Sequence, residues 1–317
     1  MIPVLTARQV EAAVSPAEAI EAIRDAFVAH ARGEWTMPPK VYVANYPAGD
    51  FRAMPAIGGG FALLKWVTSF PGNPGRGLPT VTGLVVLSDA ETGMLLALLH
   101  AGAVTALRTG AAAVLAAETL GRAGAETAAV IGTGVNGRAA VRSFVTRGRA
   151  PLLWDVDASR AEAVADELGA TRAANREEAF AADLLVTVTP GHEVLLPEGS
   201  LRPGQHVSLM GADGPGKSEI APAELARVHA FCDDWEQASH SGDLAPGVEE
   251  GLLRRADVTE LGAVLAGLAP GRADEDEVTA FDSTGLAIQD LAIARAAWRR
   301  LQDDPAGLGE VARIELG

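Results

Sequence analysis

Three basic side chains stand in segments whose pattern predicts β-strands, and together they could bind an anion. Lys65 lies in an apolar segment where alternation places it on the opposite side of the strand from Leu64 and Trp66. Lys40 and Arg52 lie in neighbouring segments that also read as strands, so the three cations can share one face. In a chain with a formal net charge of −15, such a cluster would make a local anion site. A single strand lysine is also typical of a solvated sheet edge, so both interpretations stay open.

A further basic residue, Arg108, lies within the Ala-rich segment 101–120. This segment fits a buried helix of a globular protein better than a membrane span, since it carries Arg108 together with Thr105 and Thr109. Burying an unpaired guanidinium is costly, so Arg108 needs an anion. That anion is either a carboxylate of the protein or a ligand group, a substrate carboxylate or a cofactor phosphate, which suits the planar guanidinium.

A glycine-rich turn follows an apolar strand expected at 127–132. Gly132, Gly134 and Gly137 form the pattern G-x-G-x-x-G ahead of an expected helix. The first glycine permits the tight turn, the second lets backbone approach a pyrophosphate, and the third lets helix pack on strand. Asp155 ends the next expected strand, about 20 residues on, where a carboxylate can accept both ribose hydroxyls of NAD and repel the 2′-phosphate of NADP. An ordinary βαβ turn can carry the same glycines, so the combination with Asp155 is what predicts an NAD site.

Residues 211–218 match a second phosphate-binding pattern, G-x-x-x-x-G-K-[ST], after an expected strand. A P-loop lysine should open a helix of several turns, yet Pro222 comes five residues after Lys217. We therefore favour a ligand loop at the carboxyl end of a parallel strand, with Asp213 facing the nicotinamide ring. A nucleoside triphosphatase, for which Asp233 would end a Walker B-like strand, is the weaker interpretation.

Polar residues also precede an expected helix in the segment 281–290. Ser283 or Thr284 is expected to cap the helix N-terminus, and their hydroxyl and N–H groups could also face a ligand. Cys232, the one cysteine, falls in an expected buried strand, so an intrachain disulfide and a cysteine-rich metal site are excluded. We expect no metal centre.

Composition and charge narrow the class of protein. With 317 residues, 48% hydrophobic and 21% charged, the chain has the make-up of a globular protein and room for two modest domains. Its acidic balance argues against nucleic acid and against anionic membrane surfaces as partners. The N-terminal segment lacks the basic start and long apolar core of a signal peptide, so we expect a cytoplasmic location.

The elements that position these residues fall into two groups. Up to about residue 120 the pattern predicts a mostly antiparallel sheet with few covering helices, one of them beginning at residues 15–18. From Thr127 onward strands and helices alternate, which predicts a parallel doubly wound sheet. Its strands are expected at 127–132, 151–155, 183–188, 205–210 and 229–233. Beyond Asp257 the chain reads as helical, ending in a long amphipathic helix over 285–301 that could return to the first domain.

The predicted fold class is therefore α/β with two domains. A Rossmann dinucleotide-binding domain is expected over 121–289, and an α+β, mostly antiparallel-sheet domain over 1–120 plus 290–317.

Taken together, the motifs resemble those of the ornithine cyclodeaminase/μ-crystallin family, and most closely its archaeal-type alanine dehydrogenases. The likeness runs nearly from end to end. It rests on residues 37–42, 50–55, 64–67, 71–74, 77–81, 107–111, 211–217, 236–238 with His240, and 281–290.

The resemblance implies a homodimer formed through the first domain and the C-terminal helix, with NAD bound by the Rossmann domain. It implies that Lys65 is the catalytic lysine and Asp213 the catalytic carboxylate, with Lys40, Arg52 and Arg108 binding the substrate. It also implies cofactor contacts at a larger set, in which Asn136 replaces the usual glutamine: Thr80, Arg108, Gly132, Gly134, Val135, Asn136, Gly137, Asp155, Gly211, Ala212, Lys217 and Ser283.

Arg52 distinguishes among activities of that family. The ornithine cyclodeaminases carry an acidic residue there, which suits a distal ammonium, whereas a guanidinium would repel that group by ~1 kcal/mol or more. The resemblance thus implies NAD-dependent, reversible oxidation of L-alanine or a similar small amino acid to the 2-oxo acid and ammonium. The alternatives are a ketimine or imine reductase, an opine-type synthase, a cyclodeaminase, or a non-catalytic binder of NAD(P)H.

Overall fold

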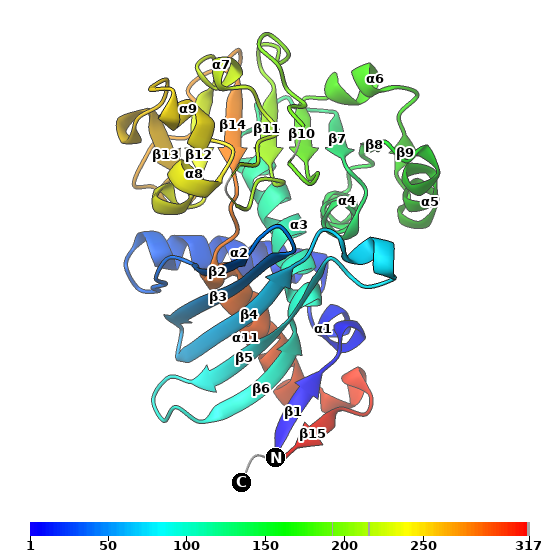
Figure 1. Ribbon diagram of the computed structural model, residues 1–317, viewed down its shortest axis with the longest axis vertical. Coiled ribbons are helices and arrows are strands. Elements are labelled where there is room, and N and C mark those ends of the chain that lie inside the picture. Colours follow the sequence, from blue (N-terminus) through cyan, green and yellow to red (C-terminus); the bar gives the residue numbers. More distant parts are fainter. Residues whose placement is uncertain (192, 215, 316–317) are drawn as a thin grey trace. The chain divides into compact units, whose positions relative to one another are not determined.

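The computed structural model describes residues 1–191, 193–214 and 216–315. The chain forms two compact units. Unit 1 consists of Met1–Arg108 and the residues from Leu286 onward, and unit 2 consists of Thr109–Gly285. Each unit is built around one sheet, as Figure 1 shows.

The sheet of unit 1 has seven strands and is antiparallel apart from one neighbouring pair, β1 and β6. This confirms the mostly antiparallel sheet expected for the first part of the chain. In spatial order the strands are β15 (Ala312–Ile314), β1 (Ile2–Leu5), β6 (Leu95–His100), β5 (Val81–Asp89), β4 (Phe61–Ser69), β3 (Gly49–Gly58) and β2 (Val41–Asn45).

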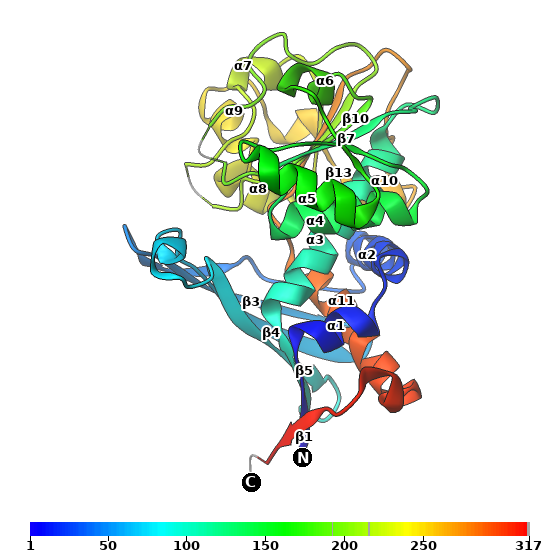
Figure 2. The same cartoon turned by 90° about the vertical axis from the view of Figure 1, so that its right-hand side faces the viewer.

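Helices cover one face of this sheet (Figure 2). The C-terminal helix α11 (Ala287–Asp303) packs on β3, β4 and β5, and α2 (Pro16–Ala31) packs on α11. A capping box between Ser15 and Glu18 starts α2 where the sequence predicted a helix start. The shorter helices are α1 (Ala7–Ala13), η1 (Asn73–Arg76) and η3 (Pro305–Leu308). The C-terminal helix therefore returns to unit 1, as expected.

Unit 2 contains an eight-stranded sheet in which every neighbouring pair is parallel. This confirms the doubly wound sheet. The strand order is β13 (Val258–Glu260), β12 (His229–Cys232), β14 (Thr279–Asp282), β11 (His206–Leu209), β10 (Leu184–Thr187), β7 (Ala128–Ile131), β8 (Leu152–Trp154) and β9 (Thr171–Arg172). The connecting helices are α4 (Val135–Thr146), α5 (Ala158–Leu168), α6 (Arg176–Phe180), α7 (Pro222–Leu225), α8 (Trp235–Ser241), α9 (Ala245–Glu249), η2 (Arg255–Asp257) and α10 (Leu261–Leu265).

The expectation that the chain is helical beyond Asp257 is wrong in one respect. β13 and β14 both lie there, and β14 inserts between β11 and β12 in the middle of the sheet. These two strands do not stand out as apolar runs that alternate with helices, which is what marked strands of similar length such as β7 and β10, so only their pairing defines them.

The division between the units falls within helix α3 (Ala101–Leu120), not at its end. The second half of α3 belongs to unit 2 because Gly110 lies against α4 and because the Ser208 hydroxyl donates a hydrogen bond to the carbonyl of Ala113. Among the residues described, α3 is the one helix long and apolar enough to cross a membrane. However, 67% of its most apolar window is buried inside the protein, as in the core helix of a globular fold.

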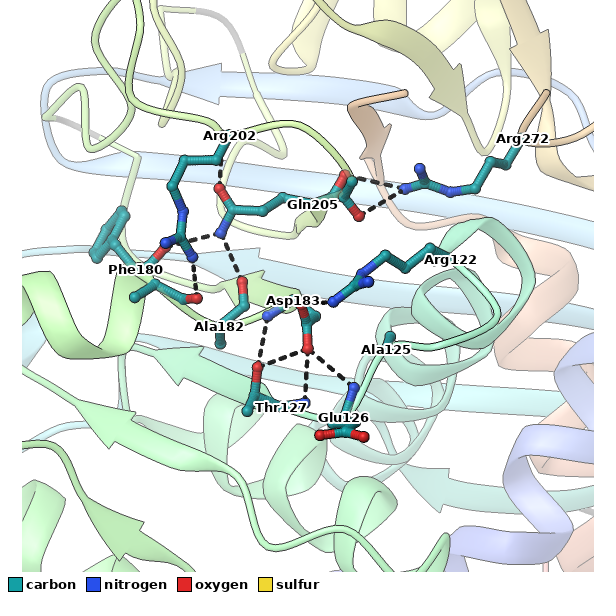
Figure 3. Close-up of polar contacts among 12 residues, drawn as sticks. Arg122, Ala125, Glu126, Thr127, Phe180, Ala182, Asp183, Arg202, Gln205 and Arg272 are labelled. Carbon is teal, nitrogen blue, oxygen red and sulfur yellow. Dashed lines mark hydrogen bonds and ion pairs between the residues drawn. The ribbon is translucent and has the colours of Figure 1, made fainter. Parts of the chain in front are cut away.

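Side-chain hydrogen bonds tie together the amino ends of the central strands of unit 2 (Figure 3). Asp183, just before β10, accepts hydrogen bonds from the backbone N–H groups of Glu126 and Thr127 and pairs with Arg122 at 2.7 Å. Burial alone would raise the pKa of Asp183, but these bonds outweigh it and hold the pKa well below its usual range. Gln205, just before β11, donates to two carbonyls at the end of α6. The side chains of Asp183 and Gln205 at this edge of the sheet are therefore paired with other groups of the protein.

Candidate active site

The cation cluster of unit 1 begins with Lys65, which lies at the centre of β4. Alternation along β4 leaves Leu64 and Trp66 41% and 43% exposed, while Lys65 is 2% exposed. The strand therefore faces as the sequence predicted, but Lys65 points into the helix-covered face and is no solvated edge residue. Its cross-strand neighbours, Met54 on β3 and Val85 on β5, are apolar and buried as well.

Asp290, on α11, is the counter-ion of this buried lysine. The Lys65 Nζ donates to both carboxylate oxygens of Asp290, at 2.9 and 3.1 Å. The Arg108 Nε lies 3.8 Å from the same carboxylate. We call these three residues the Lys65–Asp290–Arg108 triad. Its formal charge, with Lys65 protonated, is +1.

Arg108 has capacity left for another anion. Its side chain is 11% exposed, and its Nε is buried without a hydrogen-bond partner among the residues described. Arg108 therefore fits both predicted roles. It lies near a carboxylate of the protein, Asp290, and its Nε still has no hydrogen-bond partner among the residues described, so it can also bind a ligand anion. An unsatisfied buried donor costs about 1–3 kcal/mol, which an incoming carboxylate would recover.

Arg52, on β3, joins the cluster as half of a second ion pair. Its Nε and one Nη donate to the two carboxylate oxygens of Asp50 at 2.6 and 3.2 Å. Its guanidinium carbon lies 5.2 Å from the centre of the Tyr42 ring. Lys40 directly precedes β2, the strand that pairs Tyr42 with Arg52.

The pair formed by Arg52 and Asp50 carries no net charge. The repulsion of a distal ammonium therefore depends mainly on the Lys65–Asp290–Arg108 triad and not on Arg52 alone.

Lys65 is electrostatically poised for proton transfer. Burial is the largest influence on its pKa and lowers it; Asp290 opposes that effect, and Arg108 and Arg52 add to it. The result is a pKa of about 8, against 10.5 for an ordinary lysine. Amine and ammonium forms are thus both accessible near neutral pH, as acid–base catalysis requires.

In unit 2, the residues predicted to bind cofactor follow the carboxyl ends of parallel strands. Gly132 follows β7, Asp155 follows β8, Gly211 follows β11 and Ser283 follows β14. The carboxyl ends of parallel strands lie at one edge of the sheet, which is where open α/β sheets bind ligands.

The glycine turn has the backbone geometry that a dinucleotide requires. Gly132 has φ +95°, and a Cβ at Gly137 would lie 1.9 Å from the carbonyl oxygen of Gly132. A Cβ at Gly134 would meet no atom within 4 Å, so there is open space where backbone should approach a pyrophosphate. Helix α4 begins immediately afterwards, at Val135 and Asn136, and none of the described side chains caps its N-terminus, where Gly134 is the N-cap. Its first N–H groups and positive dipole end thus suit phosphate.

Asp155 is bonded to the same turn. Its carboxylate accepts hydrogen bonds from the Thr133 N–H and hydroxyl at 2.7 and 2.8 Å, and Arg160 pairs with it at 2.6 Å. Burial opposes ionisation, but the bonds from Arg160, Thr133 and Asp157 outweigh it and lower the pKa of Asp155 to about 2. The carboxylate is therefore ionised, as the predicted ribose contact requires.

The loop after β11 lacks the helix of a P-loop. Lys217 pairs with Asp213 at 2.6 Å, and the next helix, α7, begins at Pro222 and spans four residues. Pro215 of the motif lies outside the described residues. Because no helix starts at Lys217, the structure speaks against a nucleoside triphosphatase site.

Buried carboxyl groups accept hydrogen bonds from the backbone of this loop. Glu219 accepts hydrogen bonds from the Gly211 N–H and from the Thr187 hydroxyl. Asp243 accepts from the Glu219 N–H, while one of its oxygens and one of Asp282 have no hydrogen-bond partner in the described part of the chain. Burial raises the pKa of all three carboxyls, that of Asp243 to about 7. Ala212, which follows Gly211 in the loop, is fully buried.

The expected helix cap at Ser283 or Thr284 is wrong. Helix α11 has Leu286 as its N-cap, whereas the Ser283 and Thr284 hydroxyls each donate to Asp233 at 3.2 Å. Asp233 follows β12, so the hydroxyls serve a contact between two strand ends. Thr80 directly precedes β5, and its carbonyl accepts a hydrogen bond from the N–H of Phe70. Cys232 is buried within β12, as expected.

Comparison with known proteins identifies the family. A profile of the ornithine cyclodeaminase/mu-crystallin family matches residues 2–304. The chain belongs to this family. Within it, an alanine dehydrogenase of Archaeoglobus fulgidus is 40% identical over 303 residues, covering 93% of this chain and 94% of the relative.

Solved structures of the family have the same fold over the whole chain. An archaeal alanine dehydrogenase dimer with bound NAD has a TM-score of 0.92 and 37% identity, covering 99% of both chains. A Thermococcus litoralis Δ(1)-pyrroline-2-carboxylate reductase with NADH and L-proline has a TM-score of 0.91 and 26% identity, covering 99% of this chain and 100% of that one. The Rossmann domain and the predicted fold class are thereby confirmed.

The family is not uniform in activity. Relatives at 33% identity are named iminosuccinate reductase in Paracoccus denitrificans, Δ(1)-pyrroline-2-carboxylate reductase in Bacillus cereus and ornithine cyclodeaminase in Agrobacterium tumefaciens. They cover 92%, 83% and 80% of this chain. Membership therefore defines a class of NAD(P)-dependent oxidoreductases and cyclodeaminases, and the substrate has to be argued from the site.

Reasoning from the sequence did not identify the buried acidic residues Asp290, Glu219 and Asp243. Asp290 contacts Lys65 across 225 positions of sequence, a distance that no local pattern bridges. The sequence nevertheless contained a signal, because Asp290 stands within the apolar run 286–294. A charged residue that is buried in such a run needs a partner of opposite charge, as Arg108 does. Glu219 and Asp243 lie in loops without such a run, and only the structure reveals them.

Proposed function

We propose that the protein is an NAD-dependent dehydrogenase that reversibly converts L-alanine, or a similar small amino acid, into the 2-oxo acid and ammonium. The observation that carries this proposal is the single surplus positive charge of the Lys65–Asp290–Arg108 triad, with its unsatisfied Arg108 donor. One carboxylate neutralises that charge while Lys65 is protonated. When Lys65 is the amine, the proton that it takes from the substrate ammonium restores the charge. Support comes from the 40% identity to the alanine dehydrogenase of Archaeoglobus fulgidus.

The net charge of the triad also indicates which class of substrate the site favours. A distal ammonium, as in ornithine, would add a second uncompensated positive charge near a site that is already positive. A second carboxylate, as in iminosuccinate, would exceed the one surplus charge of the triad. The site therefore favours a monocarboxylate with a short neutral side chain.

The proposed steps assign separate roles to Lys65 and Asp213. Arg108, with Arg52 and Lys40, holds the carboxylate and orients the substrate. Lys65, as the amine, takes a proton from the substrate ammonium so that the Cα hydride can leave with its electron pair. NAD, when bound, supplies the hydride acceptor. Water then adds to the resulting iminium carbon, and Asp213 takes a proton from that water. Lys65 returns its proton to the nitrogen of the adduct, which departs as ammonia while the hydroxyl proton passes to water, leaving the 2-oxo acid.

The glycine turn and Asp155 are the residues that would hold NAD. The open space at Gly134, the uncapped start of α4 and the ionised Asp155 fit the pyrophosphate and the adenosine ribose.

A second candidate is a reductase of cyclic imines. A cyclic ketimine acid carries one carboxylate and no distal ammonium, so it satisfies the same charge requirement of the triad. The likeness to a pyrroline-2-carboxylate reductase complexed with NADH and L-proline favours this alternative over a cyclodeaminase.

A substrate panel distinguishes these activities. The protein is incubated with NAD and single L-amino acids, or with NADH and either pyruvate plus ammonium or Δ1-pyrroline-2-carboxylate, and absorbance of NADH is followed. Alanine-dependent formation of NADH supports the dehydrogenase, whereas consumption that requires only the cyclic imine supports the reductase. Cofactor binding without any turnover would leave a non-catalytic binder, and tight ATP binding would reinstate the P-loop interpretation.

Removing the lysine tests its role in chemistry. Lys65→Met should reduce turnover by about 100-fold or more, because general acid–base groups contribute on that order. The measurement is kcat with saturating substrate and cofactor. Retention of more than about a tenth of the wild-type rate would take Lys65 out of the reaction.

We also propose that the protein is a homodimer that associates through the open face of the unit 1 sheet. Helix α11 is largely buried within unit 1. The sheet face that it covers is therefore not available for association. The opposite face of the sheet exposes apolar side chains in a contiguous row: Ile57, Leu64, Trp66 and Leu84. Exposed apolar patches of this kind mark association surfaces. The archaeal alanine dehydrogenase neighbour is a dimer.

A further inference from the structure

Among the residues described, the side chain of Asp290 makes its polar contacts with two cations. It is fully buried on α11, and its two oxygens face the Lys65 Nζ and the Arg108 Nε. Apart from Gln289 beside it, the buried residues of this helix are aliphatic, such as Leu291 and Ile293. A well-packed apolar residue here would commonly be as stable as a buried ion pair, so its presence calls for a chemical reason.

The charged groups near Lys65 come from three elements. α11 contributes Asp290, α3 contributes Arg108, and β3 contributes the Arg52–Asp50 pair. On β5, which also pairs with the lysine's strand, the cross-strand neighbour Val85 is apolar. In the part of the chain that the structure describes, Asp290 is therefore the carboxylate in direct contact with Lys65, whereas Arg108 and Arg52 disfavour the charged form of the lysine.

We propose that Asp290 is a positioning residue for Lys65: it fixes the Nζ through both carboxylate oxygens and keeps the ammonium form accessible beside Arg108. The inference rests on the proposed function, in which Lys65 accepts a proton in one direction of the reaction and returns it in the other. Without Asp290, burial and the neighbouring guanidinium groups would hold the lysine as the amine throughout the working pH range. A permanent amine could accept a proton from the substrate but would hold none to return in the reverse direction.

The first test is the pH profile of kcat/KM. In the wild-type enzyme the acid limb should report Lys65 with an apparent pKa near 8. In Asp290→Asn that limb should move to lower pH by about 1–3 units, because an opposite charge at this range shifts a pKa by that amount. In Asp290→Glu the charge remains, so the limb should stay within about half a unit of wild type while kcat falls about tenfold from the displaced Nζ.

Leu291→Ala is the matched control. Leu291 is the next residue on α11 and is fully buried, so its truncation should lower the denaturation midpoint of the protein. The acid limb should not move. If Leu291→Ala shifts the limb as Asp290→Asn does, or if Asp290→Asn leaves it in place, the assignment is overturned.

A second measurement does not depend on turnover. The free energy of unfolding is measured as a function of pH for the wild type and for Lys65→Met. The pH dependence of the difference between them reports the ionisation of Lys65. Because the folded pKa of about 8 lies below 10.5, the unfolded chain binds more protons between those values. The contribution of Lys65 to stability should therefore increase as pH rises from 8 to 10.5 and be lost as pH falls through 8.

The same difference measured in the Asp290→Asn background should begin its increase about 1–3 pH units lower. An unshifted onset would overturn the role of Asp290 even if no substrate is turned over. Absence of alanine-dependent activity in the wild type, with this shift observed, would instead contradict only the proposed function. Should Asp290→Asn fail to fold, Asp290→Glu decides, and wild-type kcat in that variant counts against positioning.

Discussion

Asp155 accepts hydrogen bonds from Thr133 in the glycine turn, and we propose it as the acceptor for the ribose hydroxyls. In Asp155→Asn, the Thr133 hydrogen bonds and the Arg160 pair lose their anionic acceptor. We expect KM for NAD to rise about tenfold to a hundredfold, since bonds to a charged group contribute about 1.5–3 kcal/mol. KM for NADP should change less, because Arg160 is released to meet the 2′-phosphate. Initial rates with each cofactor provide the measurement.

Asp157→Ser is the control for this substitution. Asp157 lies two residues away and caps α5 through the N–H of Arg160, a function that serine preserves. Both KM values should remain within about twofold of wild type. Equal increases for NAD and NADP in Asp155→Asn would show that the carboxylate supports the turn without discriminating between cofactors.

At the scale of elements, the close approach of α3 to α4 depends on Gly110. A Cβ at this position would lie 2.4 Å from the carbonyl carbon of Ala139. Gly110→Ala should lower the free energy of unfolding by about 1–3 kcal/mol, the usual cost of overpacking, despite the better helix propensity of alanine. It should also raise KM for NAD, because α4 begins at the glycine turn. Chemical denaturation and cofactor titration measure the two effects.

Gly75→Ala provides the comparison for Gly110→Ala. A Cβ at Gly75 would meet nothing within 4 Å, so stability and cofactor affinity should both be retained. Unchanged stability in Gly110→Ala would mean that α3 and α4 separate without cost.

How far the sequence predicts these elements depends on local signals, since the strands that it predicts and those that it misses are alike in length. Strands β7, β8, β10, β11 and β12 lie within the predicted ranges, because each is an apolar run that alternates with a helix. The start of α2 is marked by its own capping box. β13 and β14 carry no such signal and become strands only by pairing with β12 and β11.

The candidate site shows the same limit. The buried direction of Lys65 follows from alternation within one strand, which sequence reveals. Its partner Asp290, and the contact of Ser283 with Asp233, join segments far apart in the chain. Such pairings are properties of tertiary packing, so spacing alone left Lys65 open between a solvated edge and an anion site and placed the helix cap at the wrong residues.

At the scale of the whole molecule, the open sheet face predicts the state of assembly. Trp66 and Leu84 are paired across β4 and β5 and are 43% and 39% exposed. The double variant Trp66→Glu/Leu84→Glu should sediment with half the native mass, because four carboxylates would then lie opposed across the proposed interface. Leu268→Glu, at an exposed apolar position of unit 2, should leave the mass unchanged. A native protein that sediments as a monomer would contradict the proposal directly.

The buried carboxyl groups beneath the loop after β11 have a thermodynamic consequence for the entire chain. The folded pKa of Asp243 is about 7, above an unfolded value of about 3.9, so folding at mildly acidic pH takes up a proton. This contribution to stability is complete below about pH 4 and is lost as pH rises through 7, opposite in sign to that of Asp155. Calorimetric unfolding enthalpies near pH 6 should therefore vary with the ionisation heat of the buffer, and Asp243→Asn should diminish that variation.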